Sequence, residues 1–99
     1  MYLLGRGLAL VERNYRTRYG EIDLIMRHAE ALVFVEVRYR NSTRFGGAIQ
    51  SVTPDKRRRL KRTALHFLKQ HPGMAVRPAR FDILALDRFR VTWITNAFE

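Results

Sequence analysis

The stretch that decides the fold of this chain is Gly20-Glu-Ile-Asp-Leu-Ile-Met-Arg-His-Ala-Glu-Ala-Leu-Val-Phe-Val-Glu-Val-Arg-Tyr-Arg40. Apolar residues alternate with polar or acidic ones on each side of Ala29-Glu30. Such alternation, rich in β-branched residues, is typical of strands. The stretch therefore predicts a β-hairpin that carries carboxylates in the middle of its strands, where apolar or neutral side chains are more usual.

The register of this hairpin decides what the carboxylates can do. A turn centred on residues 29 and 30 places Asp23 opposite Glu36 and Glu21 opposite Arg38, with facing Cβ atoms about 5 Å apart. Two carboxylates at that distance repel, and a divalent cation between them turns the repulsion into a binding site. A slip of one residue would destroy the pairing.

Composition predicts a small globular domain that meets a polyanion. The chain has 99 residues, of which 46% are hydrophobic, and its formal net charge is +10. This length suits one domain that spans residues 1–99. Sixteen of the nineteen basic residues are arginine, which favours forked contacts to phosphate. Nucleic acid is the first candidate, although acidic lipid or ribosomal RNA would explain the charge equally well.

Several classes of protein are excluded by what the sequence lacks. There is no cysteine, so neither a disulfide scaffold nor a thiolate metal site is expected. No signal peptide is recognisable, and no apolar run is long enough to span a bilayer. These features predict a soluble, cytoplasmic protein that makes no contact with a membrane.

The rest of the chain predicts a mixed sheet with one long helix. Strands are expected at 8–14, 80–86 and 89–95, with a basic connector at 15–20 and a tight turn at 87–88. Thr53 and Pro54 are good first residues for a helix, which His71-Pro-Gly ends. A strand, a crossover helix and a further strand imply that the fourth strand runs parallel to the third. The core is expected to include Phe67, Phe81, Phe89 and Trp93.

Two groups of cations are candidates for nucleic-acid binding. One flanks a loop after the hairpin, and the other lies at the start of the long helix, where cations are unfavourable for the helix dipole. They are Arg40 and Arg44 in the first group, and Lys56, Arg57 and Arg58 in the second.

Six motifs, in this order along the chain, resemble the bacterial YraN family, which is itself similar to restriction-endonuclease-like nucleases and Holliday-junction resolvases of the PD-(D/E)xK type. They are Asn14-Tyr-Arg, Gly20-Glu-Ile-Asp-Leu-Ile, Val33-Phe-Val-Glu-Val-Arg, Phe45-Gly, Arg80-Phe-Asp and Asn96-Ala-Phe. The resemblance implies a restriction-endonuclease-like α/β domain with a helix, three strands, a helix and a strand (αβββαβ) as its core.

The resemblance also implies a chemistry, the cutting of phosphodiester bonds in DNA with Mg²⁺ or Mn²⁺. In that superfamily an acid on the second strand and an acid-x-Lys on the third strand form the metal site. By resemblance Asp23 and Glu36 take the metal-binding positions, Arg38 stands where lysine is frequent, and Glu21 assists through a bound water. These four are the candidate catalytic residues.

Two departures from the pattern bear on activity. Arg38 can stabilise negative charge but cannot act as a base, because its guanidinium stays protonated. The family also has a longer first helix that carries a glutamate, and nothing before Leu8 corresponds to it. The first helix is therefore expected to be truncated.

Three classes of function stay open at this point. They are a metal-dependent nuclease acting on DNA, including branched DNA, a nucleic-acid-binding module with a nuclease fold but no chemistry, and a basic protein that docks on a ribosome or an acidic partner. The alternative for Asp23 and Glu36 is a pair of carboxylates bonded to neighbouring arginines, and an ion pair is expected for Asp82. Because junction resolvases are symmetric dimers, a homodimer is also expected.

Overall fold

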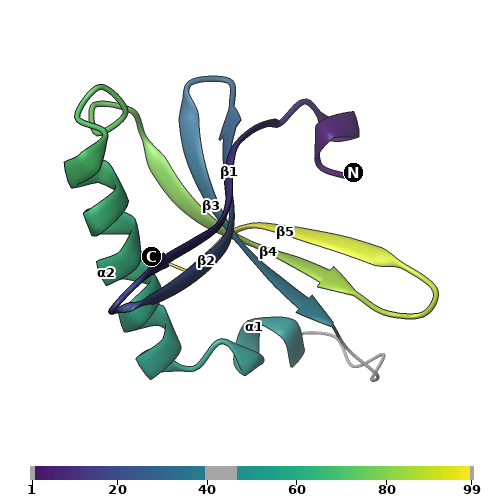
Figure 1. Cartoon of the computed structure of the whole chain (residues 1–99). Coiled ribbons are helices and arrows are strands. Elements are labelled where there is room, and N and C mark those ends of the chain that lie inside the picture. The colour runs from purple at the N-terminus through teal and green to yellow at the C-terminus, as the bar shows by residue number, and fades with distance from the viewer. Residues whose placement is uncertain (1, 40–46, 99) are drawn as a thin grey trace.

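Five strands form one mixed sheet in which each strand lies beside its neighbour along the chain (Figure 1). The computed structural model describes residues 2–39 and 47–98. Strands β3 and β4 run parallel, and the other neighbouring pairs run antiparallel. The α/β class, the mixed sheet and the parallel fourth strand are therefore confirmed. The strands are β1 (Ala9–Thr17), β2 (Gly20–His28), β3 (Ala31–Tyr39), β4 (Ala79–Leu86) and β5 (Val91–Phe98).

The long helix α2 (Pro54–Gln70) lies along one face of the sheet and connects β3 to β4 (Figure 1). Its start is the predicted one, because the Thr53 side chain accepts a hydrogen bond from the Lys56 backbone N–H at 3.2 Å. Two shorter elements are the 3₁₀ turn η1 (Leu4–Arg6) and the helix α1 (Gly47–Ser51). At five residues, α1 is too short for its sequence to show a helical period.

The core lies mainly between α2 and the sheet. Leu60, Ala64 and Phe67 recur at helical spacing and are buried against strand residues that include Ile22, Ile25, Phe34 and Ile83. Full burial of a side chain such as Phe67 contributes roughly 2–3 kcal/mol. On the other face a smaller cluster joins Leu3 and Leu8 to Met26, Val33, Val35 and Leu84.

The central hairpin has the predicted register and then forks. Pairs from His28↔Ala31 to Leu24↔Val35 follow the turn at residues 29 and 30. Beyond Leu24 the strand β2 pairs only with β1, and β3 continues beside β4. The predicted facing of Glu21 and Arg38 is therefore wrong, because the two strands have parted before that point.

Strand ends differ from the predictions at three places. Strand β1 runs on to Thr17 through most of the expected connector, and β5 runs on to Phe98 through the expected tail. The turn between β4 and β5 has four residues, because the Asp87 side chain accepts hydrogen bonds from the backbone N–H groups of Phe89 and Arg90. Phe89 is consequently 83% exposed, so its placement in the core is wrong.

Within residues 2–39 and 47–98, no helix combines the length and the apolar character needed to cross a membrane.

Candidate active site

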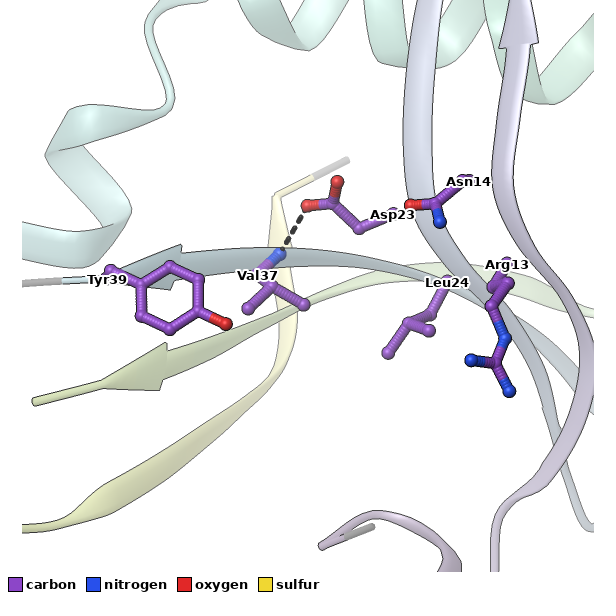
Figure 2. Close-up of a pocket in the computed structure, with 6 residues that line it drawn as sticks. All are labelled: Arg13, Asn14, Asp23, Leu24, Val37 and Tyr39. Carbon is purple, nitrogen blue, oxygen red and sulfur yellow. Dashed lines mark hydrogen bonds between the residues drawn. The ribbon is translucent and has the colours of Figure 1, made fainter.

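Asp23 lies where β2 and β3 part, and its side chain takes over the pairing there. One carboxylate oxygen, Oδ2, accepts a hydrogen bond from the Val37 backbone N–H at 2.8 Å (Figure 2). The bond holds the acid of β2 against β3 just beyond the last paired residues. This hydrogen bond therefore holds the Asp23 carboxylate beside β3 and close to Glu36.

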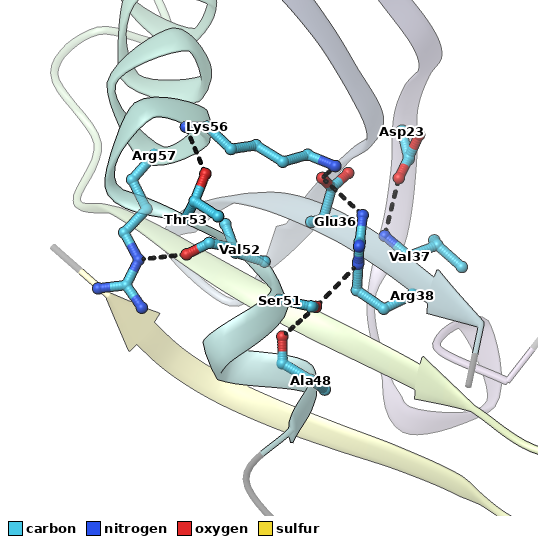
Figure 3. Close-up of polar contacts among 10 residues, drawn as sticks. All are labelled: Asp23, Glu36, Val37, Arg38, Ala48, Ser51, Val52, Thr53, Lys56 and Arg57. Atoms are coloured by element: carbon cyan, nitrogen blue, oxygen red, sulfur yellow. Dashed lines mark hydrogen bonds and ion pairs between the residues drawn. The ribbon is translucent and has the colours of Figure 1, made fainter. Parts of the chain in front are cut away.

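Glu36 projects from β3 toward the start of α2 and is only 5% exposed (Figure 3). The Lys56 ammonium lies 2.7 Å from its Oε2 atom, and the Arg38 guanidinium lies 4.0 Å from the same atom. Neither contact has the geometry of a hydrogen bond, and no other described residue donates one to Oε2. The buried Oε2 atom of Glu36 is therefore held by an ion pair with Lys56 and has no further donor among the described residues.

The electrostatic surroundings of Glu36 raise its pKa to about 7. The largest cause is burial, which disfavours the charged form, and hydrogen bonding with Asp23 and the charge on Asp23 raise the pKa further. Lys56 lowers this pKa, first through its close side-chain contact with Glu36 and then through its positive charge, both of which favour the carboxylate. The acid is consequently balanced between its two protonation states near neutral pH, so a bound cation would displace its proton.

The contact between Lys56 and Glu36 was not predicted from the sequence. We expected Lys56 to contact nucleic acid, and its ammonium lies on Glu36, twenty positions earlier in the chain. The Thr53 cap fixes the first turn of α2, and this turn directs the lysine toward the fork (Figure 3). The signal that was available is the cation itself, placed at the end of a helix where the dipole disfavours it.

The other two candidate catalytic residues are held by different partners. The Nε atom of Arg38 donates to the Ser51 hydroxyl at 3.1 Å, which ties the guanidinium to α1 (Figure 3). Glu21 pairs with Arg16 of β1 at 3.1 Å. The structure thus brings Asp23, Glu36 and Arg38 together, whereas the Glu21 carboxylate is paired with β1.

The candidate nucleic-acid contacts of α2 also differ from one another. Arg57 donates to the backbone carbonyls of Val52 and Ile49, so its guanidinium joins α2 to α1. Arg58 is exposed and pairs with Asp55. Arg40 and Arg44 lie outside the described residues.

An open cleft of about 320 Å³ leads to the Asp23 side of the fork (Figure 2). It is lined by Arg13, Asn14, Asp23, Leu24, Val37 and Tyr39. Tyr39, at the edge of the cleft, is 82% exposed. Asn14 has a φ of 53°, a left-handed conformation that asparagine tolerates better than most residues. The Asn14-Tyr-Arg motif was the available signal for this wall of the cleft.

Asp23 and Glu36 suit a metal that needs few protein ligands. No cluster of three or more histidine, cysteine or acidic side chains suited to a metal occurs within the described ranges. Mg²⁺ typically keeps several waters and is held by one or two carboxylates together with substrate phosphates. Two neighbouring carboxylates, one with a buried oxygen that lacks a hydrogen bond, fit that requirement.

Asp82 lies outside this site and is a structural residue, as expected. It is fully buried and accepts hydrogen bonds from the Arg80 guanidinium at 3.0 Å, the Trp93 indole at 2.9 Å and the Asn96 backbone N–H at 2.9 Å. A buried carboxylate with this many donors is well satisfied. The Arg80-Phe-Asp motif therefore fastens β4 to β5.

Fold and site together describe a small α/β protein with a carboxylate pair at a forked sheet. The chain matches the family described as "Uncharacterised protein family UPF0102" over residues 1–86. It is 54% identical over 101 residues to a UPF0102 protein of Ralstonia nicotianae, covering 98% of this chain and 77% of the relative. It is 48% identical over 102 residues to one of Nitrosococcus oceani, covering 99% and 82%. The chain therefore belongs to the UPF0102 family, the YraN family of its sequence motifs.

The raised pKa of Glu36 predicts a pH-dependent stability. Between pH 4.5 and about 7 the folded state keeps a proton that the unfolded chain has released, so stability falls as the pH rises through this window. We expect Glu36→Gln to remove that fall. The free energy of unfolding of the variant, relative to wild type, should therefore be higher at pH 8 than at pH 5 by roughly 1 kcal/mol or more. Urea denaturation at both values measures it, with Glu30→Gln in the hairpin turn as the control for one lost charge. An equal effect of Glu36→Gln at both pH values would contradict the assignment.

Proposed function

We propose that this protein is a nuclease that uses Mg²⁺, or Mn²⁺ in its place, to hydrolyse phosphodiester bonds of DNA. The observation that carries the proposal is the convergence at the fork of Asp23, the buried Glu36 and Lys56. The family resemblance assigns the same two acids to the metal. The formal charge of +10 supports a polyanionic substrate.

Asp23 and Glu36 would hold the metal, each from a different strand. When bound, Mg²⁺ supplies charge neutralisation at the phosphate and an activated water. The chain positions the two ligands. The Val37 backbone N–H orients Asp23, and burial of the Glu36 side chain restricts the directions it can take. Burial of Glu36 also limits how many waters can surround that carboxylate.

Lys56 is the cation best placed to act beside these acids. It lies at Glu36, whereas Arg38, the residue in the acid-x-Lys position, is tied to Ser51. An ammonium can stabilise the charge of the transition state, and unlike a guanidinium it can also lose a proton when its surroundings favour that. With Asp23 and Glu36 holding the metal, the Lys56 ammonium would be available to the scissile phosphate or the attacking water.

A preference for branched DNA, a symmetric homodimer and a cytoplasmic location belong to the same proposal. They follow from the resemblance to junction resolvases and from the composition. The second candidate function is a nucleic-acid-binding module without catalysis. It is favoured by Arg38 in the usual lysine position and by the ion pair that already neutralises Glu36.

Metal binding at the two acids is the direct test of the nuclease proposal. Calorimetry with Mg²⁺ or Mn²⁺ is expected to show binding to wild type that Asp23→Asn and Glu36→Gln abolish. Glu21→Gln is the matched control and should keep it, because the Glu21 carboxylate belongs to the ion pair with Arg16. Cleavage of linear, flapped or four-way DNA should be lost in the same two variants. No metal binding by wild type, even with DNA present, would overturn the proposal in favour of the binding module.

The role of Lys56 predicts a shift in the pH dependence of metal binding. Because its charge lowers the pKa of Glu36, Lys56→Met should raise that pKa above 7 and move half-maximal Mg²⁺ binding to higher pH. Cleavage should fall even at the pH where Mg²⁺ binding is restored. The matched control is Lys61→Met, an exposed lysine of the same helix. An unchanged pH profile and full cleavage by Lys56→Met would contradict the role.

A further inference from the structure

A second concave basic surface follows α2 away from the carboxylate pair. It consists of two adjoining clefts that share Arg62, and we refer to the pair of clefts as the α2 trough. One cleft, of about 210 Å³, is lined by Asp55, Arg58, Arg59 and Arg62. The other, of about 340 Å³, is lined by Tyr19, Arg62, Leu65, His66 and Lys69.

Three cations of the α2 trough have no carboxylate partner within the described residues. Arg59, Arg62 and Lys69 are exposed and recur at intervals of three and seven residues, so they lie along one side of the helix. None of them forms an ion pair with a described carboxylate, and the one acid in the lining, Asp55, is paired with Arg58. The helix residues that pack on the sheet are others, Leu60, Ala64 and Phe67.

The β1–β2 turn supplies an aromatic wall to the trough. The turn rests on α2, since a Cβ placed at Gly20 would lie 3.4 Å from the Thr63 hydroxyl oxygen and 3.5 Å from the Arg59 Cβ. Arg18 stacks on the Tyr19 ring and donates to its hydroxyl at 2.9 Å. The pKa of Tyr19 is lowered, mainly by Arg18 and more weakly by Lys69 and Arg62, so these cations surround one phenol.

We propose that the α2 trough binds the phosphate backbone of the nucleic acid on one side of the cleavage site. Guanidinium and ammonium groups without a carboxylate partner lie here beside the half-buried Tyr19 ring. Nucleic-acid-binding proteins use such cations, together with aromatic rings, to hold a phosphate backbone. The predominance of arginine favours phosphate recognised by forked contacts. The inference rests on the proposed nuclease only for the location of the cut, because backbone binding in the trough does not require cleavage.

The length of α2 sets the reach of this surface. From Lys56, which contacts Glu36, to Lys69 in the last turn the helix rises about 20 Å, at roughly 1.5 Å per residue. That length corresponds to about six nucleotides of a duplex at roughly 3.4 Å each. Substrates should therefore extend about six nucleotides beyond the scissile phosphate to gain the full affinity.

Charge reversal within one helix provides a matched pair of variants. Lys69→Glu changes the trough, and Lys61→Glu makes the same change in net charge at an exposed position outside its lining. Binding is measured by fluorescence anisotropy with a labelled 20-base-pair duplex in EDTA, so that no cleavage occurs. We expect Lys69→Glu to weaken binding at least fivefold and Lys61→Glu less than twofold. The salt dependence, as log Kd against log salt, should fall by about one unit for Lys69→Glu, since one phosphate contact is lost.

Equal effects of the two variants would overturn the inference, because binding would then depend on net charge alone. Circular dichroism is used to check that each variant is folded. If wild type binds through the trough and cuts no DNA with any metal, the inference stands and the nuclease proposal fails. If wild type cuts DNA and Lys69→Glu binds like Lys61→Glu, only the inference fails.

Discussion

The site depends on one constraint, a buried carboxylate that the fold cannot fully satisfy. Glu36 belongs to a strand whose neighbours are apolar and buried, so its side chain is removed from water together with them. Its Oε2 atom has the Lys56 ammonium at 2.7 Å but no hydrogen bond from the described residues. Burial of a charge costs free energy unless it is paired and hydrogen-bonded. Glu36 therefore depends on a neighbouring cation, which is Lys56 in this structure and would be a metal ion in the proposed nuclease.

The fork of the sheet explains why two acids from different strands, Asp23 and Glu36, lie close together. Where β2 turns away to stay with β1, the Val37 N–H would lose its backbone partner, and Asp23 supplies a side-chain oxygen instead. One hydrogen bond thereby closes the gap in the ladder and holds a second carboxylate near Glu36. The start of α2 completes the arrangement, since the helix cap and the lysine that reaches Glu36 belong to the same turn. Strand pairing, helix capping and electrostatics meet at this point.

The sequence predicted the parts of the structure that depend on local pattern. Alternation set the register of the central hairpin, and the Thr53-Pro54 start set the beginning of α2. It failed where partners are distant. Nothing local to Glu21 shows that β2 leaves β3 before reaching Arg38, and nothing local to Lys56 shows that it lies on Glu36. Phe89 was misplaced because its hydrophobicity outweighed the turn that Asp87 organises around it.

The most direct test of the metal site is a carboxyl ¹³C NMR titration of Glu36 with and without Mg²⁺. Without metal we expect a midpoint near pH 7, caused by burial and by Asp23. With saturating Mg²⁺ the midpoint should fall by a pH unit or more, because the cation binds the ionised form. A midpoint near the ordinary value of 4.5 that does not move with Mg²⁺ would contradict both the buried acid and the metal site.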